Sequence, residues 1–296
     1  MIARPFDNSV NWRLPGGILG RLPALIVGLA VTALASGEDP RPITVASTTS
    51  TQNSGLFEYL LPKFTAETGI DVRVVAVGTG QAIRLATNGD ADVLLVHHPA
   101  SERSFVADGL GLARYPVMHN DFVIVGPGDD PAGIRGTTYA ATALRRIGEG
   151  EHVFVSRGDD SGTHKKELEL WQAAGFDPRP AGGAWYRESG SGMGTTLNTA
   201  SAMGAYTLTD RASWVSFGNK GELRLLVEGD SRLHNPYSVI VVNPERHPHV
   251  HAVEAQAFAD WLTSATGQRA IAAFRVDGQQ LFFPDAAGAS GGADTE

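Results

Sequence analysis

Short apolar runs alternate with amphipathic stretches along the chain from about Pro42 onward. The runs 43–47, 72–77 and 93–96 are rich in β-branched residues and predict strands. Between the first two of them, apolar side chains recur at helical spacing over 56–64 and predict a helix with one buried face. Strands that alternate with helices in this way are typical of an α/β architecture with largely parallel sheets.

A second set of alternating elements begins near Thr137. Its strands are predicted at 153–156, 185–187, 205–208 and 223–227. The main helix of this set is predicted from about Gly162 to Ala174, with Leu168 and Trp171 facing inward. Gly175 stands where a glycine commonly ends a helix.

Two extended runs that lie next to prolines, 121–125 and 237–242, join the two sets. They predict a hinged, two-lobed receptor in which two strands cross the hinge and a ligand cleft lies between the lobes; one continuous doubly wound sheet is the alternative. The expected organisation is a signal peptide at 1–35, the first part of lobe I at 36–125, lobe II at 126–235, a return to lobe I at 236–285 and a disordered tail of small residues at 286–296.

The N-terminal segment has the features of a secretory signal peptide. Three arginines precede an apolar run over 22–34, and this run ends on the small-x-small pattern Ala33-Leu34-Ala35. The run is shorter than the roughly 20 apolar residues of a membrane-spanning helix, although a permanent N-terminal anchor is an alternative. The chain has no cysteine to carry a disulfide or a lipid. We therefore expect cleavage after Ala35 and a soluble periplasmic protein.

The charge of the chain narrows the range of partners. Its 24 basic and 32 acidic side chains become 21 and 31 once residues 1–35, with three arginines and one aspartate, are removed, so the mature net charge is −10. This charge, without a basic stripe, argues against nucleic acid as a partner. An anionic ligand would have to be held by local groups, because the overall field repels it weakly.

Four loops share one composition: each follows a predicted strand, is rich in serine, threonine and glycine, and leads toward a predicted helix. They cover 47–51, 78–80, 156–163 and 189–194. Such a loop presents backbone N–H groups at the positive end of a helix dipole, and glycine lets the backbone approach a ligand. Helix capping would explain any one of them. Four such loops, two in each lobe at the carboxyl ends of strands, predict a cage of donors for an anion.

The third loop carries the only cation of the four, Arg157, whose planar fork of donors suits an oxyanion. Asp159 or Asp160 can hold this fork in place, although a surface Arg–Asp pair is the simpler alternative. The predicted ligand-binding residues are Ser47, Thr48, Thr49, Ser50, Gly78, Thr79, Gly80, Arg157, Ser161, Gly162, Thr163, Ser189 and Ser191. The chain has neither a P-loop nor the third glycine of a dinucleotide site, so no nucleotide cofactor is expected.

These residues closely resemble the tungstate-binding proteins of tungstate ABC transporters. The shared stretches are 47–56, 75–82, 89–97, 120–127, 156–167 and 206–211, in a match that runs in order from about Thr44 to Phe283. The resemblance implies a type II-like periplasmic-binding-protein fold without catalysis or cofactor, and an inner-membrane ABC permease as partner of a monomer. It also implies that 47–50 and Arg157 touch the ligand. Two positions depart from the family: Ser47 replaces a threonine, and Ser191 stands where glutamine is common.

Phosphate is the alternative ligand within the same fold, because the stretch from Arg157 to Thr163 also resembles a loop of phosphate-binding proteins. Phosphate carries a proton near neutral pH, so a tight phosphate site needs a carboxylate acceptor, whereas a carboxylate would repel tungstate, molybdate or sulfate. The first two loops contain no acidic residue. This favours a proton-free dianion, with tungstate and molybdate not separable by size or charge.

Two further hypotheses are weaker. A serine hydrolase would use Ser161 and His164, but Ser161 lacks the Gly-x-Ser-x-Gly elbow of such enzymes and no orienting acid is evident. Histidines at 97–98 and at 247, 249 and 251 could ligate zinc, but the latter group lies among prolines and far in sequence from the four loops. We therefore expect neither catalysis nor a metal site.

Overall fold

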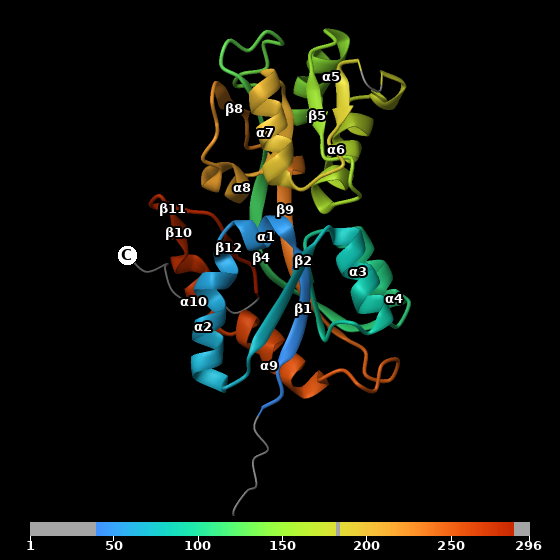
Figure 1. The fold of residues 1–296 in the computed structure, drawn as a ribbon, viewed down its shortest axis with the longest axis vertical. Coiled ribbons are helices and arrows are strands. Elements are labelled where there is room, and N and C mark those ends of the chain that lie inside the picture. The colour runs from blue at the N-terminus through green and yellow to red at the C-terminus, as the bar shows by residue number, and fades with distance from the viewer. Residues whose placement is uncertain (1–39, 182–183, 287–296) are drawn as a thin grey trace, which may run out of the picture. The chain divides into compact units, whose positions relative to one another are not determined.

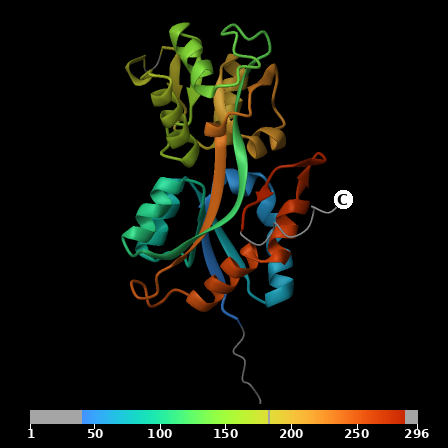
Figure 2. The ribbon, with the colours of Figure 1, turned by 180° about the vertical axis from the view of Figure 1, so that it is seen from behind.

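The computed structural model describes residues 40–181 and 184–286, so the predicted signal peptide at 1–35 lies outside the described residues. Two lobes are connected by two long strands, β4 (Gly111–Pro127) and β9 (His234–Val242) (Figures 1 and 2). Among the described residues, no helix combines the length and the apolar character needed to span a membrane.

Lobe I is built from both ends of the described chain. Its elements are β1 (Ile43–Thr48), α1 (Thr49–Asn53), α2 (Leu56–Thr68), β2 (Val72–Val77), α3 (Thr79–Asn88), β3 (Val93–Val96), α4 (Pro99–Ala107), α9 (Ala252–Thr263), α10 (Ala265–Ala273), β10 (Arg275–Val276), β11 (Gln279–Gln280) and β12 (Phe283–Pro284). Lobe II contains α5 (Ala140–Glu149), β5 (Phe154–Ser156), α6 (Gly162–Ala173), η1 (Arg179–Ala181), β6 (Tyr186–Glu188), α7 (Met193–Met203), β7 (Thr207–Asp210), α8 (Arg211–Ser216), β8 (Leu223–Val227) and η2 (Ser231–Leu233).

The sheets are mixed, which corrects the expectation that they are largely parallel. In lobe I the strand order is β12-β4-β9-β3-β1-β2, and β1 pairs in parallel with β2 and β3. However, β9 is antiparallel to both β3 and β4. The cause is topological: the chain leaves lobe I along β4 and returns along β9, so these neighbouring strands must run in opposite directions.

Both hinge strands are longer than predicted. β4 pairs with β9 and β12 in lobe I and continues into lobe II, where it pairs with β7 and β8. Its first ten residues include polar side chains and Pro116, so they do not form the apolar run by which a buried strand is recognised. The strand exists there because its backbone groups pair with β9 between Gly111 and Asp121, and with β12 at Met118 and His119.

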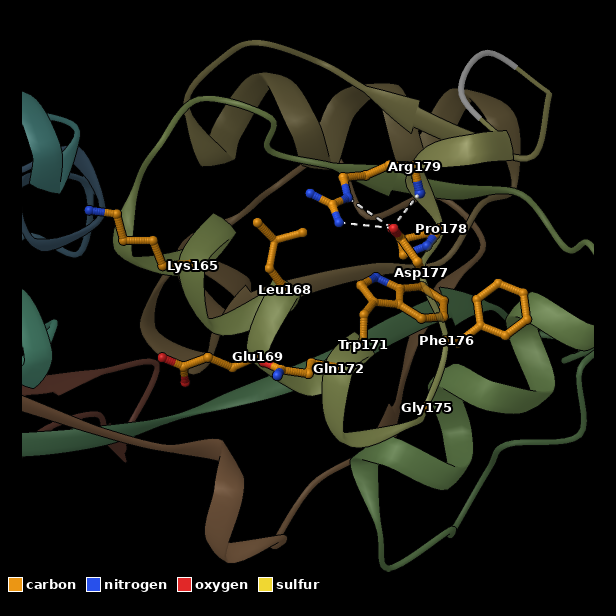
Figure 3. A pocket seen from close by; sticks show the side chains of 10 residues that line it. All are labelled: Lys165, Leu168, Glu169, Trp171, Gln172, Gly175, Phe176, Asp177, Pro178 and Arg179. Carbon is orange, nitrogen blue, oxygen red and sulfur yellow. Dashed lines mark hydrogen bonds and ion pairs between the residues drawn. The ribbon is translucent and has the colours of Figure 1, made fainter.

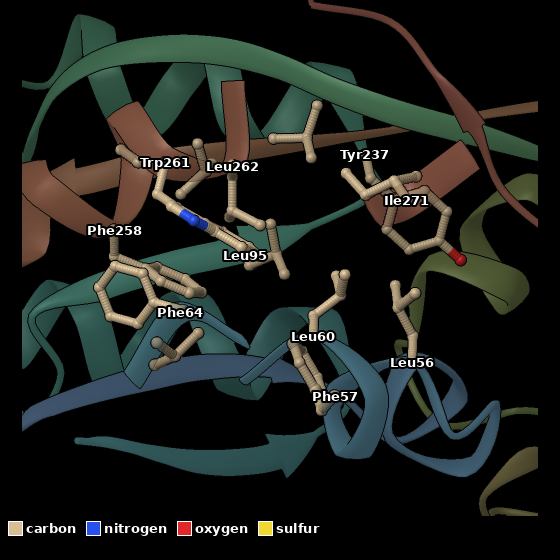
Figure 4. Packing of buried hydrophobic residues seen from close by; sticks show 14 of the residues in the cluster. Leu56, Phe57, Leu60, Phe64, Leu95, Tyr237, Phe258, Trp261, Leu262 and Ile271 are labelled. Carbon is tan, nitrogen blue, oxygen red and sulfur yellow. The ribbon is translucent and has the colours of Figure 1, made fainter. Parts of the chain in front are cut away.

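The centre of the lobe I sheet, at β3, is buried on both faces. Val93 and Leu95 point into one apolar cluster, and Leu94 and Val96 point into another, as the alternation of side chains along a strand requires. In the first cluster, side chains of α2 pack against α9 and α10 (Figure 4). Leu61, one of the apolar residues within the predicted stretch 56–64, is only half-buried. Each large apolar side chain buried in these layers stabilises the fold by about 1.5–3 kcal/mol.

Lobe II has its own two-sided core. On one face, α5 and α6 cover β4 and β5 with an aromatic group that includes Phe154, Trp171 and Tyr186. Trp171 is buried as predicted, whereas Leu168 is half-buried and Leu170 takes the core position. Gly175 has φ of 68° directly after Ala174, the residue that caps the C-terminal end of α6, which confirms its helix-ending role.

The C-terminal part of the described chain stays packed against lobe I. Ala286 is buried, and its backbone N–H donates to Gln268 Oε1 at 3.0 Å. The prediction of a disordered segment from 286 is therefore wrong at this first residue, because a buried amide holds the backbone there. Residues 287–296 of that predicted tail lie outside the described residues.

Candidate functional site

Three helices begin at a small, tightly closed cavity between the lobes. The helices are α1 and α3 of lobe I and α6 of lobe II. The lining residues are Thr48, Thr49, Ser50, Val77, Gly78, Thr79, His97, Arg157, Ser161, Gly162 and Thr163. The first N–H groups of a helix have no intrahelical acceptor, and the helix dipole makes this end positive. Three such ends at one cavity create a site for an anion.

The start of α1 follows directly from the sequence of the first loop. Thr48 ends β1 in an extended conformation, and its hydroxyl accepts a hydrogen bond from the backbone N–H of Thr51. The same hydroxyl lies 3.1 Å from Ser50 Oγ. Side-chain capping by threonine therefore turns the strand end into a helix start, and the hydroxyl network lies at the cavity wall.

The lobes touch where α3 and α6 begin. The backbone N–H of Gly162 donates to Thr79 Oγ1 across the lobe boundary at 3.0 Å. A β-carbon on Gly162 would lie 2.9 Å from His97 Cε1 and 3.0 Å from Thr79 Oγ1. Glycine is needed at this position because the two lobes approach so closely.

The first turns of the three helices at the cavity, α1, α3 and α6, contain no acidic residue. The helices α5, α7, α8 and α10 share this absence, whereas α2, α4 and α9 carry Glu58, Glu102 and Glu254 in their first turns. An acidic side chain at a helix start stabilises the helix by pairing with its dipole. Because the first turns of α1, α3 and α6 carry no acidic side chain, the positive ends of these helices remain available for a bound anion.

Arg157 is the one cation that lines the cavity, and its side chain is only 2% exposed. Its Nη2 donates to Asp159 Oδ2 at 2.5 Å, and its Nε donates to the backbone carbonyl of Ser191 at 2.8 Å. These contacts engage one edge of the guanidinium, which has five N–H donors in a rigid fork. Other N–H groups of the fork can therefore donate to a ligand.

His97 also lines the cavity, although the sequence interpretation treated it only as a weak metal candidate. It follows β3, its Nδ1 lies 2.8 Å from Asn235 Oδ1, and its Nε2 lies 3.5 Å from Ser50 Oγ. Burial lowers the pKa of His97 from 6.5 to about 4. The ring is thus neutral at pH 7. The rule that ligands meet the carboxyl ends of strands could have identified it, since it follows a predicted strand.

Glu167 lies behind the arginine loop, fully buried in α6. Its Oε1 accepts hydrogen bonds from Tyr186 OH at 2.8 Å and Trp171 Nε1 at 3.2 Å. Burial raises the pKa of this carboxyl to about 7, against the opposing effect of its hydrogen bonds. The group connects α6, β6 and the end of β5, and so supports the backbone that carries Arg157.

Several predicted site residues lie elsewhere than at the cavity wall. Ser47 is inside β1 and donates to the carbonyl of Leu95 at 2.7 Å, because side chains alternate along the strand. Ser189 Oγ pairs with Thr196 Oγ1 at 2.7 Å. The fourth loop thus holds Arg157, through the carbonyl of Ser191, and does not line the cavity.

Gly80 and Asp160 face each other at the rim of the site. A β-carbon on Gly80 would collide with the Asp160 carboxylate, so this glycine makes room for the opposite lobe. Asp160 is exposed and pairs with Lys165 at 3.5 Å, whereas Asp159 holds the arginine. Of the two acids predicted to support Arg157, the structure therefore assigns this contact to Asp159.

The arrangement does not favour the hydrolase hypothesis. The Ser161 hydroxyl caps α6 by accepting from the backbone N–H of His164, and the ring of His164 accepts from the backbone N–H of Asp160 at 3.2 Å. In these contacts the imidazole of His164 accepts a hydrogen bond from the loop backbone and not from the Ser161 hydroxyl. The other histidine group is also engaged: His247 and His249 bind the carbonyls of Thr87 and Gly89.

A larger hollow is a separate feature on lobe II, of about 700 Å³ (Figure 3). It lies along α6 and η1, where Trp171 and Phe176 form an apolar wall beside the Asp177–Arg179 ion pair. It lacks the convergent helix starts and buried cation of the small cavity. Volume alone therefore does not identify the functional site.

Comparisons with known proteins agree with this geometry. The family model for a PBP superfamily domain matches residues 34–266. The tungstate-binding protein TupA of Peptoclostridium acidaminophilum is 44% identical over 277 residues, which cover 89% of this chain and 96% of that protein. The structure of TupA from Desulfovibrio alaskensis G20 has 47% identity and a TM-score of 0.72, covering 83% of this chain and 99% of that one. A tungstate ABC transporter structure from Geobacter sulfurreducens has the same identity and TM-score, with coverage of 79% and 98%.

Proposed function

Because the chain belongs to the PBP superfamily and, within it, to the family of tungstate-binding proteins, we propose that it captures tungstate for an ABC transporter. The observation that carries the proposal is the meeting of three acid-free helix starts with the buried fork of Arg157 at one cavity. These groups are donors, as a fully deprotonated oxyanion requires. Molybdate, which has nearly the same size and charge, is a second ligand of the same site.

The cavity chemistry disfavours phosphate as the main ligand. Among the described residues that line the cavity, none is a carboxylate. The nearby Asp159 is engaged by Arg157, and Asp160 is exposed and paired with Lys165. A protonated phosphate would lack the strong acceptor that its hydroxyl requires, and leaving a buried donor unpaired costs about 1–3 kcal/mol.

We infer that His97 adds another donor to the ligand, through a chain of two buried amides. In the structure, Asn235 Nδ2 donates to Asn120 Oδ1 at 2.6 Å, which leaves the buried Nδ2 of Asn120 without a partner among the described residues. Turning both amides by 180° keeps the contacts but reverses each donor and acceptor. The unpaired atom is then an oxygen, which is tolerated better than an unpaired N–H.

In the reversed arrangement, the amide nitrogen of Asn235 donates to Nδ1 of His97. The neutral ring must then carry its proton on Nε2, the atom next to Ser50 at the cavity. A proton-free dianion favours this tautomer because it receives an N–H donor, and a bound anion thereby orients the whole amide chain.

The central prediction concerns ligand identity. Tungstate should bind the purified mature protein tightly and raise its melting temperature, followed by molybdate, with sulfate and phosphate far weaker. Calorimetric titration in a phosphate-free buffer, followed by competition with each anion, would measure the order. Displacement of tungstate by equimolar phosphate would reject the proposed ligand in favour of the phosphate alternative.

Closure of the lobes on the ligand should depend on Gly162. Gly162→Ala would place a methyl group against His97 and Thr79 of the opposite lobe. Overpacking costs roughly 1–3 kcal/mol, so tungstate affinity measured by calorimetry should fall at least about fivefold. The matched control is Gly194→Ala, near the start of α7, where a β-carbon meets nothing within 4 Å. Equal affinity of both variants would show that the lobes need not meet at Gly162.

We also propose the cellular setting of this function. The arginines and apolar run of the N-terminal segment support export to the periplasm, with a mature N-terminus at Ser36. There the protein acts as a monomeric receptor that delivers the oxyanion to an inner-membrane permease. It does so without catalysis, cofactor or nucleic acid, in keeping with the acidic balance of the mature chain.

A further inference from the structure

We propose that His119, His234 and Asp285 form a second binding site, for a divalent transition-metal cation such as zinc. One possible ligand atom from each of the three side chains lies within 4.8 Å of the other two. The cluster lies on the hinge strands and is distinct from the oxyanion cavity, none of whose lining residues belongs to it. Neither histidine was singled out by the sequence, because they are far apart in the chain.

The backbone places these three side chains together. His119 lies opposite Pro236 in the β4–β9 ladder, and His234 lies opposite Asp121, so the two histidines are diagonal neighbours on one face. Asp285 follows β12, which pairs with β4 on its other side. The N–H of Asp285 donates to the carbonyl of Val117 at 3.1 Å, and this fixes its position.

The side chains are already close to the geometry of a metal site. His119 Nδ1 and Asp285 Oδ1 are 2.7 Å apart, and the two imidazole rings lie 4.8 Å apart between centroids. Zinc binds such ligands at about 2.0–2.2 Å in a tetrahedron, so ligand atoms are roughly 3.4 Å apart. The observed separations therefore require shifts of about an ångström. Rotation of half-buried or exposed side chains can supply these shifts without moving the strands.

The ligand set selects the class of cation. Two imidazoles and one carboxylate suit zinc and neighbouring transition metals, with the fourth position open to water, whereas magnesium and calcium prefer oxygen ligands throughout. A hollow of about 520 Å³ that includes His119 and His234 gives an ion access from solvent. A simple ion pair between His119 and Asp285 would explain the contact between these two side chains, but it would not explain why His234 lies beside them.

Zinc titration of the tag-free mature protein, without tungstate, tests this site. We expect one zinc ion per chain by calorimetry, and at least tenfold weaker binding in His234→Gln. His234 is exposed, so this variant should fold. Asp285→Asn should weaken zinc similarly. The control His249→Gln alters the other histidine group and should bind zinc like the parent.

A second measurement makes the result independent of calorimetry. Cobalt should give the intense visible absorption of a tetrahedral site in the parent and not in His234→Gln, and zinc should raise the melting temperature of the parent and of His249→Gln more than that of His234→Gln. Absence of zinc binding to the parent, unchanged affinity in His234→Gln, or loss of binding in His249→Gln would each overturn the proposal. None of these outcomes depends on the identity of the oxyanion.

Discussion

Replacing Arg157 by alanine should weaken tungstate binding at least tenfold, and by up to about a thousandfold. A hydrogen bond to a charged group contributes about 1.5–3 kcal/mol, and truncation of a desolvated charged partner costs roughly 2–5 kcal/mol. Each 1.4 kcal/mol corresponds to about one decade in affinity. Arg157 is buried at the cavity and is its only lining cation among the described residues. Its removal should therefore lower the affinity for tungstate more than removal of any single hydroxyl.

Matched variants separate the possible causes of this loss. Lysine at 157 should recover only part of the affinity, because it restores the charge without the planar fork. Thr49→Ala should cost less than Arg157→Ala. The double variant Arg157→Ala with Asp159→Asn should bind better than Arg157→Ala alone, since the single change leaves the Asp159 carboxylate unpaired near the anion.

Arg179→Ala controls for net charge, because it removes an exposed cation of the same lobe that pairs with Asp177. It should bind tungstate like the parent. All variants should remain folded by circular dichroism, since Arg157 contacts two loops and not an apolar core. Parental affinity in a folded Arg157→Ala protein would show that neutral donors alone form the cage.

The second large effect should appear in the pH dependence of stability. The pKa of Glu167 is raised to about 7 in the folded protein, so its contribution to stability is fully present below pH 4.5 and is lost as the pH rises through 7. The pKa of His97 is lowered to about 4, so its contribution is present above pH 6.5 and is lost as the pH falls through 4. These opposite trends overlap and largely cancel in the parent.

Single variants should expose each trend. In Glu167→Gln, the free energy of unfolding should fall on acidification from pH 6.5 to 4 relative to the parent, by as much as about 3 kcal/mol. Glutamine keeps an acceptor for Tyr186 and Trp171, so the packing should survive. In His97→Gln, the free energy of unfolding should instead rise relative to the parent over the same change in pH.

Urea unfolding of the ligand-free protein at several pH values between 4 and 7.5 would measure both slopes. Glu169→Gln is the control, because it removes an exposed carboxylate from the same helix. Slopes of the same sign in Glu167→Gln and His97→Gln would contradict the opposed contributions. A slope in Glu167→Gln no steeper than in Glu169→Gln would show that the carboxyl is not held protonated by burial.

Much of the fold follows from patterns between neighbours in the sequence. The predicted strands at 72–77, 93–96 and 223–227 agree with the structure. At 93–96 a continuous apolar run defines a strand buried on both faces, and the other two runs are rich in β-branched or large apolar residues although Arg73 and Arg224 interrupt them. The helix start after Thr48 and the stop at Gly175 are equally local, since each depends on one residue and the backbone beside it.

The direction of the sheet strands and the ends of β4 could not be obtained in this way. Sequence alternation indicates that strands and helices follow one another, but antiparallel pairing at β9 results from the return of the chain through the hinge. The polar start of β4 forms a strand because β9 pairs with it. The order of residues within this segment contains no periodic pattern that would predict this pairing.

At the site, local composition determined that donors follow the strands, while tertiary packing decided which donors face the cavity. Ser47 and Thr48 look alike in sequence, yet one binds a carbonyl inside the sheet and the other caps a helix, because alternate side chains of a strand point in opposite directions. His97 and the amides of Asn120 and Asn235 come from three distant segments. They are brought together only because β3, β4 and β9 are neighbours in the folded sheet. Hydrogen bonds between residues that are distant in the chain leave no periodic pattern in the sequence from which they could be predicted.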